Sequence, residues 1–275
     1  MPPHDLPCGE APISEGEAGF PSVGSPTSLG AELHHSSSFT AMLVDLDDTL
    51  YQDPEIPRLV LSGIKDYMCT ELGVAEDRVD QLAYDYYINS GTTMAGLVAD
   101  GHHVDYDDWH SKVHHFLPYE ELLKPDPQLK DLLTGIPLRK WIFTNADTKH
   151  AEICLRIMGL TDCFEGVISF ESLMETAART GLIKDRNSGP VICKPNKEAF
   201  RLALEAANMK ASETLFLDDS VRNVTSAREY GIFSILVKPG DGHWSGPTIS
   251  SLHDLPTAQP QLWESIDKAA TVPLA

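Results

Sequence analysis

Three carboxylates stand almost side by side directly after the apolar run Ala41–Val44: Asp45, Asp47 and Asp48. Like charges at the mouth of a buried strand raise one another's pKa unless a cation lies among them. The cluster therefore predicts a site for a metal ion or a bound charged substrate. These residues alone are equally compatible with a strand followed by a turn whose aspartates cap the next helix.

Polar residues also follow two later apolar runs: Thr144 and Asn145 follow the first, and Asp218 and Asp219 follow the second. Strands that alternate with amphipathic helices predict an α/β fold with a parallel sheet and right-handed crossovers. Ligands bind such sheets beyond the carboxyl ends of the strands, so these side chains should share one rim with the aspartates of 45–47. The expected strands are 41–44, 141–143, 166–168, 215–217 and 232–237, and the expected helices are 150–158, 196–207 and 223–230.

The segment 54–123 breaks this alternation and is largely helical in pattern. We expect it to form a small all-helical cap domain inserted after the first strand, while Pro125 and Pro127 mark the return to the core. The predicted division is a disordered tail over 1–39, a catalytic core over 40–53 and 124–256, the cap over 54–123, and a C-terminal tail over 257–275. The helices expected in the cap are 57–72, 77–89, 94–99 and 106–116.

Composition narrows the class of protein. The 275 residues carry a net charge of −20, from 41 acidic and 21 basic residues, which argues against binding to nucleic-acid polymers or anionic membranes by bulk charge. No run approaches the roughly 18 apolar residues of a membrane span, and the first 40 residues contain no Lys or Arg, unlike a secretory or transit peptide. We expect a soluble protein of the cytoplasm, with the nucleus as the alternative location and with no indication of oligomeric state.

His110 and His114 lie four residues apart on an expected helix, a spacing that suits two zinc ligands. No third or fourth ligand follows at the spacing of a metal site. Zinc at this position is therefore the less favoured interpretation.

Four short segments occur in this order along the chain: Asp45 to Thr49, Thr144, Lys194 with Pro195, and Asp218 with Asp219. In residue type and order they resemble the four motifs of the haloacid dehalogenase-like phosphatases. The chain is similar to the pyrimidine 5′-nucleotidase branch of that superfamily over residues 40–256. This resemblance implies a Rossmann-like core, a helical cap after the first motif, and Mg²⁺. It further implies a phosphoric monoester hydrolase of nucleotide metabolism. The segments that carry the closer similarity are 43–51, 86–87 with 91–97, 123–126, 143–146 with 150–151, 193–195, and 216–220 with Asn223.

The resemblance also assigns catalytic roles. Asp45 would attack phosphorus and become an aspartyl-phosphate, and Asp47 would act as general acid and base. Because a free Asp has a pKa of about 3.9, the surroundings of Asp47 should raise its pKa. Lys194 would supply fixed positive charge, and Thr144 and Asn145 would contact the phosphate.

The metal ligands implied by the resemblance are Asp45, the backbone carbonyl of Asp47, and Asp219, because oxygen ligands suit Mg²⁺. Asp218 would act on this site indirectly. Asn223 stands where many relatives carry a second acid, and it belongs to the same indirect set.

Substrate choice would belong to the cap, where Tyr84 and Tyr87 are about one helical turn apart and could flank a base. Packing inside the cap is the competing role for these tyrosines. The segment 91–96, which includes Gly91, Thr92 and Thr93, could form a loop that approaches the substrate closely. Ser90 stands where members of the branch usually have Tyr or a similar residue.

We expect a small phosphorylated metabolite as substrate, with UMP and CMP favoured among nucleoside 5′-monophosphates. A sugar phosphate is the alternative substrate, and a regulatory protein on the same fold is the alternative class. Asp47 and Asp219 argue against a dehalogenase, which needs neither a metal nor a proton donor two residues after its nucleophile.

Overall fold

The computed structural model describes residues 39–187, 189–238 and 244–263. The tails expected over 1–39 and 257–275 lie outside the described residues, apart from Phe39 and the stretch 257–263. None of the helices in the described ranges combines the length and the apolar character that a membrane crossing requires.

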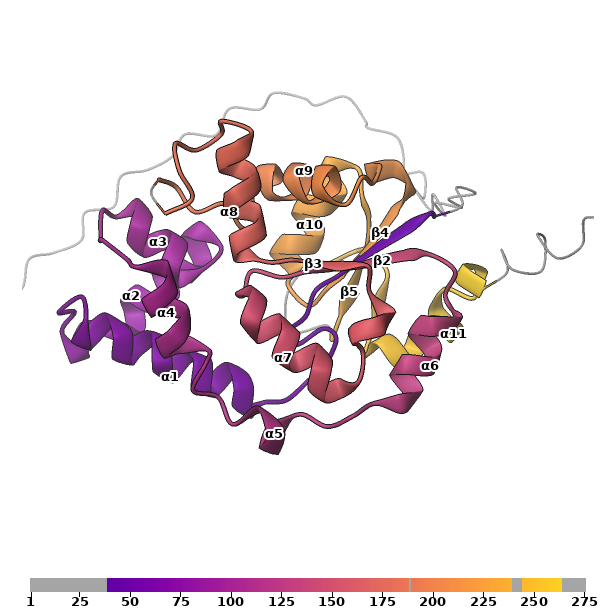
Figure 1. Cartoon of the computed structure of the whole chain (residues 1–275), viewed down its shortest axis with the longest axis horizontal. Helices are drawn as coiled ribbons and strands as arrows, with labels where there is room; N and C mark the ends of the chain where they lie inside the picture. The colour runs from indigo at the N-terminus through magenta and orange to yellow at the C-terminus, as the bar shows by residue number, and fades with distance from the viewer. Residues whose placement is uncertain (1–38, 188, 239–243, 264–275) are drawn as a thin grey trace, which may run out of the picture. The chain divides into compact units, whose positions relative to one another are not determined.

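The sheet has six parallel strands in the order β3-β2-β1-β4-β5-β6 (Figure 1). The parallel α/β fold predicted from the sequence is therefore confirmed, and each of the five expected strands is present. The sequence missed β6, which is too short to give a periodic signal. The strands are β1 Ala41–Val44, β2 Arg139–Phe143, β3 Gly166–Ile168, β4 Thr214–Asp218, β5 Phe233–Val237 and β6 Thr248–Ile249.

Helices cover both faces of the sheet, because the side chains of each strand alternate between two apolar cores. Leu43 of β1 points into the core formed with α8 to α10, whereas Met42 and Val44 point into the core formed with α6, α7 and α11. These helices are α6 Pro127–Gly135, α7 Thr148–Met158, α8 Phe170–Arg179, α9 Lys197–Ala206, α10 Val221–Tyr230 and α11 Leu255–Ala258.

Three core helices, α6, α8 and α11, were not expected from the sequence, and two of them, α6 and α8, have a clear start signal. Asp126 caps α6, whose first residue is Pro127, and Ser169 caps α8 through a reciprocal bond with Ser172. Proline at the first helical position and a capping box both favour helix initiation. The local signals were therefore present in the sequence.

The segment 54–123, called the helical insert below, leaves the core after β1 and returns before α6 (Figure 1). Its first helix begins at Glu55, two residues before the expected start, because Pro57 is tolerated in a first turn. Its fourth helix ends at Val113 instead of reaching Phe116. The insert contains α1 Glu55–Thr70, α2 Glu76–Ser90, α3 Thr93–Ala99, α4 Tyr106–Val113 and α5 Tyr119–Leu122.

Candidate active site at the strand ends

A buried lysine organises the carboxyl ends of the central strands. Lys194 is 1% exposed, and its Nζ donates to Asp45 Oδ1 at 2.6 Å and Asp218 Oδ2 at 2.7 Å. The third donor bonds the carbonyl oxygen of Phe143, also at 2.7 Å. An ammonium group has three donors, and all three are used here. The motif residues Asp45, Lys194 and Asp218 are therefore in direct contact, although 149 and 24 positions separate them along the chain.

Carboxylates outnumber cations at this centre. Asp45, Asp218 and Asp219 each place one carboxylate oxygen within 4.8 Å of the others, and Lys194 bonds Asp45 and Asp218 of this group. Burial and the neighbouring carboxylates raise the pKa of Asp45 well above its usual range and raise the pKa of Asp219 to about 7. The raised pKa values mean that the ionised carboxylates need a further positive partner, and the all-oxygen donor set fits a hard divalent cation such as Mg²⁺.

Asp218 is engaged by other groups. Beyond its bond to Lys194, its Oδ1 accepts from the backbone N–H of Ser220 at 2.8 Å and from Asn223 Nδ2 at 2.9 Å. The side chain is fully buried. Asn223 can donate to this carboxylate, whereas an acid in its place would repel it.

Asp47 differs from the expectation that its surroundings raise its pKa. Its Oδ1 accepts a bond from His150 Nε2 at 2.7 Å and another from Tyr51 Oη. Burial alone would raise the pKa of Asp47, but the opposite charge and hydrogen bond of His150 outweigh it and lower that pKa to about 2. The same partner raises the pKa of His150 despite the burial of the ring. Asp47 and His150 therefore form an ion pair, and the expectation of a raised pKa for Asp47 is wrong for this arrangement.

Thr144 and Asn145 follow β2 on the same rim. Thr144 is buried and lines the cavity, and its Oγ1 accepts the backbone N–H of Ala146 at 3.0 Å, which leaves its hydroxyl proton free to point elsewhere. Asn145 exchanges two bonds with the backbone of Lys194, one at 3.0 Å and one at 2.9 Å. Its side-chain amide therefore holds the lysine loop in place and uses one of its two N–H donors to do so, which leaves the second N–H for a further partner.

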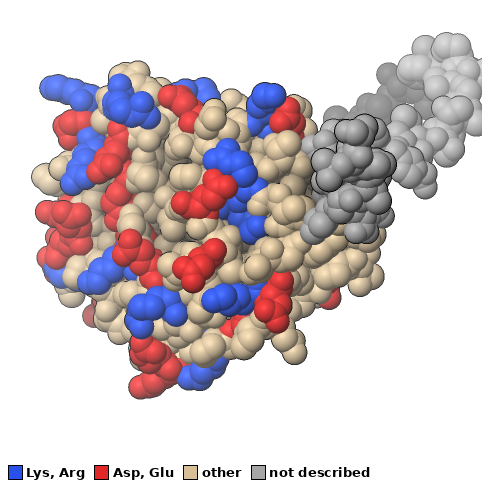
Figure 2. Space-filling view, turned by 45° about the vertical axis from the view of Figure 1, so that its right-hand side comes forward, with Lys and Arg blue, Asp and Glu red and all other residues tan. Residues whose placement is uncertain are grey.

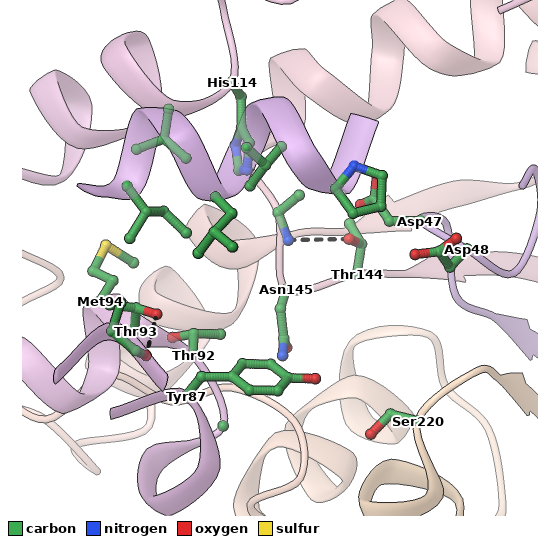
Figure 3. Close-up of a pocket in the computed structure, with 18 of the residues that line it drawn as sticks. Asp47, Asp48, Tyr87, Thr92, Thr93, Met94, His114, Thr144, Asn145 and Ser220 are labelled. Carbon is green, nitrogen blue, oxygen red and sulfur yellow. Dashed lines mark hydrogen bonds between the residues drawn. The ribbon is translucent and has the colours of Figure 1, made fainter. Parts of the chain in front are cut away.

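A cavity of about 560 Å³ lies between these strand ends and the helical insert, within the size range of small-molecule sites. Figure 3 shows Asp47 and Thr144 on the core side, with Thr93 and Met94 of the insert across the cavity. On the face in Figure 2, acidic and basic side chains are interspersed. Positive charge facing a ligand comes from the cavity lining, which includes Lys194 and Arg222.

The tyrosines proposed to flank a base line this cavity. Tyr84 is 61% and Tyr87 45% exposed, so neither is packed inside the insert, which was their competing role. The guanidinium of Arg222 lies 4.3 Å from the Tyr87 ring centroid and donates to the carbonyls of Tyr87 and Ile88. An exposed aromatic face beside a fixed cation suits a planar group attached to an anion.

Gly91 brings the insert against the lysine loop. A Cβ at this position would lie 2.5 Å from the carbonyl oxygen of Lys194, and the φ of Gly91 is +92°. Only glycine meets both demands without strain. Thr92 caps α3 through the backbone N–H of Ala95, and the buried Thr93 donates to the carbonyl of Ala83 at 3.1 Å. All three residues line the cavity, and their own contacts are structural.

A second polar cluster joins the insert to the core. Asp147, the N-cap of α7, accepts from His114 Nδ1 at 2.7 Å and from His115 Nε2 at 3.0 Å, and these contacts hold its pKa far below the usual range. Burial lowers the pKa of His110 to about 3. His150 follows one turn into α7, so the cluster adjoins Asp47.

Sequence reasoning assigned no role to Asp147, His150 or Arg222. For Asp147 and His150 a local signal was available. Asp147 follows the Thr144 motif and stands three residues before His150, which is the spacing of an N-cap residue and the first turn of a helix that starts at the rim. The contact of Arg222 with Tyr87 joins segments 135 positions apart and has no such signal.

Comparison with known proteins agrees with this architecture. The family model for haloacid dehalogenase-like hydrolases matches residues 39–231. Phosphate metabolism protein 8 of Saccharomyces cerevisiae is 28% identical over 202 residues, which cover 70% of this chain. The match spans 59% of the length of that yeast protein.

Two solved structures share the fold. CbbY from Rhodobacter sphaeroides, in complex with phosphate, matches with a TM-score of 0.53 and 18% identity over 79% of this chain and 96% of its own. The hydrolase YfnB from Bacillus subtilis, bound to magnesium, matches with a TM-score of 0.51 and 19% identity over 80% of this chain and 98% of its own. The region that the family model matches contains strands β1 to β4 and every motif described at their ends, so the chain belongs to the haloacid dehalogenase-like hydrolases.

Proposed function

We propose that this protein is a Mg²⁺-dependent phosphatase of nucleoside 5′-monophosphates, with UMP and CMP as the favoured substrates. The observation that carries the proposal is the buried contact of Lys194 with Asp45 and Asp218 at the floor of the cavity. In this proposal Asp45 is a nucleophilic carboxylate beside fixed positive charge, which an attack on an anionic phosphate ester requires.

Asp45 is the proposed nucleophile. Its Oδ1 is held by Lys194, and Thr49 Oγ1 donates to Oδ2 at 3.2 Å, so the carboxylate has one orientation. An Asp45 oxygen attacks phosphorus, the bond from phosphorus to the ribose oxygen breaks, and an aspartyl-phosphate forms. Thr144 donates its hydroxyl proton to a phosphoryl oxygen. Water then attacks the same phosphorus and displaces the Asp45 oxygen as phosphate leaves.

The Asp47–His150 pair supplies the proton in the first step and accepts one in the second. At neutral pH the carboxylate is ionised and the imidazole is charged, so one proton resides on His150 Nε2, 2.7 Å from Asp47 Oδ1. That proton can move to Asp47 as Asp47 protonates the departing ribose oxygen. Asp47 then takes a proton from the attacking water and returns the pair to its starting state.

Mg²⁺ held by Asp45, the carbonyl of Asp47 and Asp219 would neutralise charge between the nucleophile and the phosphate. The buried excess of carboxylates, with the pKa of Asp219 raised to about 7, supports this assignment. Asp218 and Asn223 support the site through the bonds already described. Magnesium is named for the YfnB structure, which shares the fold.

We propose that the helical insert acts as a cap domain over the cavity and that Tyr84 and Tyr87 contact the base. Both rings are exposed on the cavity wall, and Arg222 beside Tyr87 adds positive charge. Stacking on an aromatic ring is worth about 1–3 kcal/mol per base, enough to separate nucleotides from sugar phosphates.

The test is phosphate release from a panel of pyrimidine and purine 5′-monophosphates and sugar phosphates, with Mg²⁺ and with EDTA. We expect release from UMP and CMP that depends on Mg²⁺. Release from sugar phosphates alone would replace the nucleotide substrate with the alternative, whereas release from no phosphate ester would favour a regulatory protein on this fold.

A further inference from the structure

His110 has an unusual environment within the described part of the chain. Its side chain is 5% exposed, and neither ring nitrogen has a hydrogen-bond partner. A buried polar group without a partner is costly, and native structures rarely keep one without a use for it. The nearest opposite charge is Asp147 Oδ2, 3.6 Å from His110 Nδ1, beyond hydrogen-bond distance.

We propose that His110, His114 and Asp147 form a binding site for a transition-metal dication of the zinc class. One ligand atom from each residue lies within 4.8 Å of the other two. The distances from Asp147 Oδ2 are 2.7 Å to His114 Nδ1 and 3.6 Å to His110 Nδ1. Tetrahedral zinc with bonds of about 2.0–2.1 Å has donors about 3.4 Å apart, so the two distances bracket the value that a bound ion requires.

The three ligands come from two parts of the fold. His110 lies on α4 of the helical insert and His114, four residues later, is the C-cap of that helix, and their rings stack with centroids 5.5 Å apart. Asp147 belongs to the core and caps α7. A metal ion bound here ties the insert to the core at the edge of the cavity.

The carboxylate of Asp147 is oriented for this role. Its Oδ1 accepts from His115 Nε2 and from the backbone N–H of His150, each at 3.0 Å, which turns Oδ2 toward His110 and His114. Bonds of this kind to a ligand's second atom fix its geometry and strengthen metal binding.

The donor chemistry separates this site from the strand-end carboxylates. Two imidazoles and one carboxylate select zinc-class ions, whereas the cluster of Asp45, Asp218 and Asp219 offers oxygen alone, as Mg²⁺ prefers. His110 and His114 also line the cavity, so a fourth coordination position faces the space where a substrate enters.

The experiment titrates Co²⁺ and then Zn²⁺ into the metal-stripped full chain in excess Mg²⁺, following Co²⁺ d–d absorbance and Zn²⁺ binding by calorimetry. The wild type and the strand-end variant Asp219→Asn should bind one equivalent that Zn²⁺ displaces. Binding should weaken at least tenfold in Asp147→Asn and in His110→Phe, and the surface control His103→Ala should bind like the wild type.

X-ray absorption of the zinc-loaded wild type gives a readout that needs no variant, and it should show two imidazole ligands and oxygen donors. Absence of Co²⁺ binding to the wild type, binding that Asp219→Asn abolishes, or a zinc shell without imidazole would each overturn the proposal. Phosphate release by the Mg²⁺-loaded protein is a separate measurement, so the zinc site and the phosphatase stand or fall independently.

Discussion

The strand-end site and the histidine cluster at the insert both contain buried aspartates, but the groups that balance the charge of these aspartates differ. At the strand ends Lys194 bonds two carboxylates and leaves negative charge in excess. At the insert, Asp147 is alone among histidines, two of which bond it directly. The first arrangement suits a hard cation and an anionic substrate, whereas the second suits proton sharing and softer metal binding.

The two regions also differ in the role that we expect for each. Residues at the strand ends come from core loops and would act on phosphorus in the proposed reaction. The histidine cluster joins the helical insert to α7 and contacts the strand-end site through His150. Substitutions at the strand-end site should therefore abolish turnover or folding. Substitutions in the histidine cluster should alter the pH dependence of turnover and weaken the contact of the insert with the core.

Removal of the nucleophile is expected to have the largest effect. Asp45→Asn keeps the shape of the side chain but cannot form an aspartyl-phosphate, so phosphate release should fall about 10³-fold or more. The matched control is Asp48→Asn, because Asp48 bonds Lys238 instead of Lys194. Steady-state kinetics with Mg²⁺ measures both variants, and near-normal activity in Asp45→Asn would contradict the assigned nucleophile.

Lys194→Met should cost stability as well as activity. The substitution leaves Asp45 and Asp218 buried without their ammonium partner, a change worth about 3–5 kcal/mol in folding free energy. Urea unfolding measures the loss, with the exposed Lys197→Met as control. An unfolding free energy within about 1 kcal/mol of the wild type would show that the lysine does not hold the cluster together.

His150→Gln tests the link between the two sites. Glutamine can donate to Asp47 but cannot carry a proton, so kcat should fall about 10–100-fold with little change in KM, and the pKa of Asp47 should rise. The exposed His253→Gln serves as control. Equal pH–rate profiles for His150→Gln and the wild type would remove His150 from the proton path.

The same ion pair makes stability depend on pH. The pKa of Asp47 is lowered to about 2, so its contribution is present above its ordinary pKa and lost as pH falls toward 2. The pKa of His150 is raised, so its contribution is full below about pH 6.5 and is lost as pH rises through the folded value. The stability gap between the wild type and His150→Gln should peak between about pH 4 and 6.5, at about 1 kcal/mol because Asp47 is partly exposed. A gap that grows steadily with pH would contradict the pairing.

Gly91→Ala tests how closely the insert must approach the lysine loop. The new methyl group would meet the carbonyl of Lys194. We therefore expect activity to fall about tenfold, in addition to any effect of placing alanine at a positive φ. Gly73→Ala is the matched control, because Gly73 has φ +68° and nothing within 4 Å of a Cβ. Equal activity in the two variants would show that the contact does not position Lys194.

The smallest expected effect concerns the base. Tyr87→Ala should raise KM for UMP about tenfold and leave KM for ribose 5-phosphate unchanged, since only the nucleotide has a base to stack. Ile88→Ala, on the same helix and also exposed, is the control. An equal rise for both substrates would place Tyr87 against the phosphate or ribose instead.

Sequence and structure agree best where the signal is local. The apolar run before Asp45 and the polar residues after each run predicted the parallel sheet and the rim where these side chains meet, because strand period and strand-end position can be read from consecutive residues. The histidine pair at the C-terminal end of α4 was also visible in the sequence. Its third partner, Asp147, lies 33 positions beyond His114, and only the docking of the insert on α7 reveals it.

The prediction of a raised pKa for Asp47 is wrong for a similar reason. Burial is foreseeable for a residue just after a buried strand, and burial alone raises an acid's pKa. The bond from His150, 103 positions away, reverses the sign. Whether a buried carboxylate is neutral or charged depends on the partner that the tertiary fold brings to it.

The most direct test of the phosphatase proposal is rapid acid quenching of the protein with 5′-³²P-labelled UMP and Mg²⁺. We predict protein-bound label that hydroxylamine releases, that maps to the peptide containing Asp45, and that is absent in Asp45→Asn. Turnover of UMP without bound label, or label that persists in Asp45→Asn, would contradict the aspartyl-phosphate mechanism.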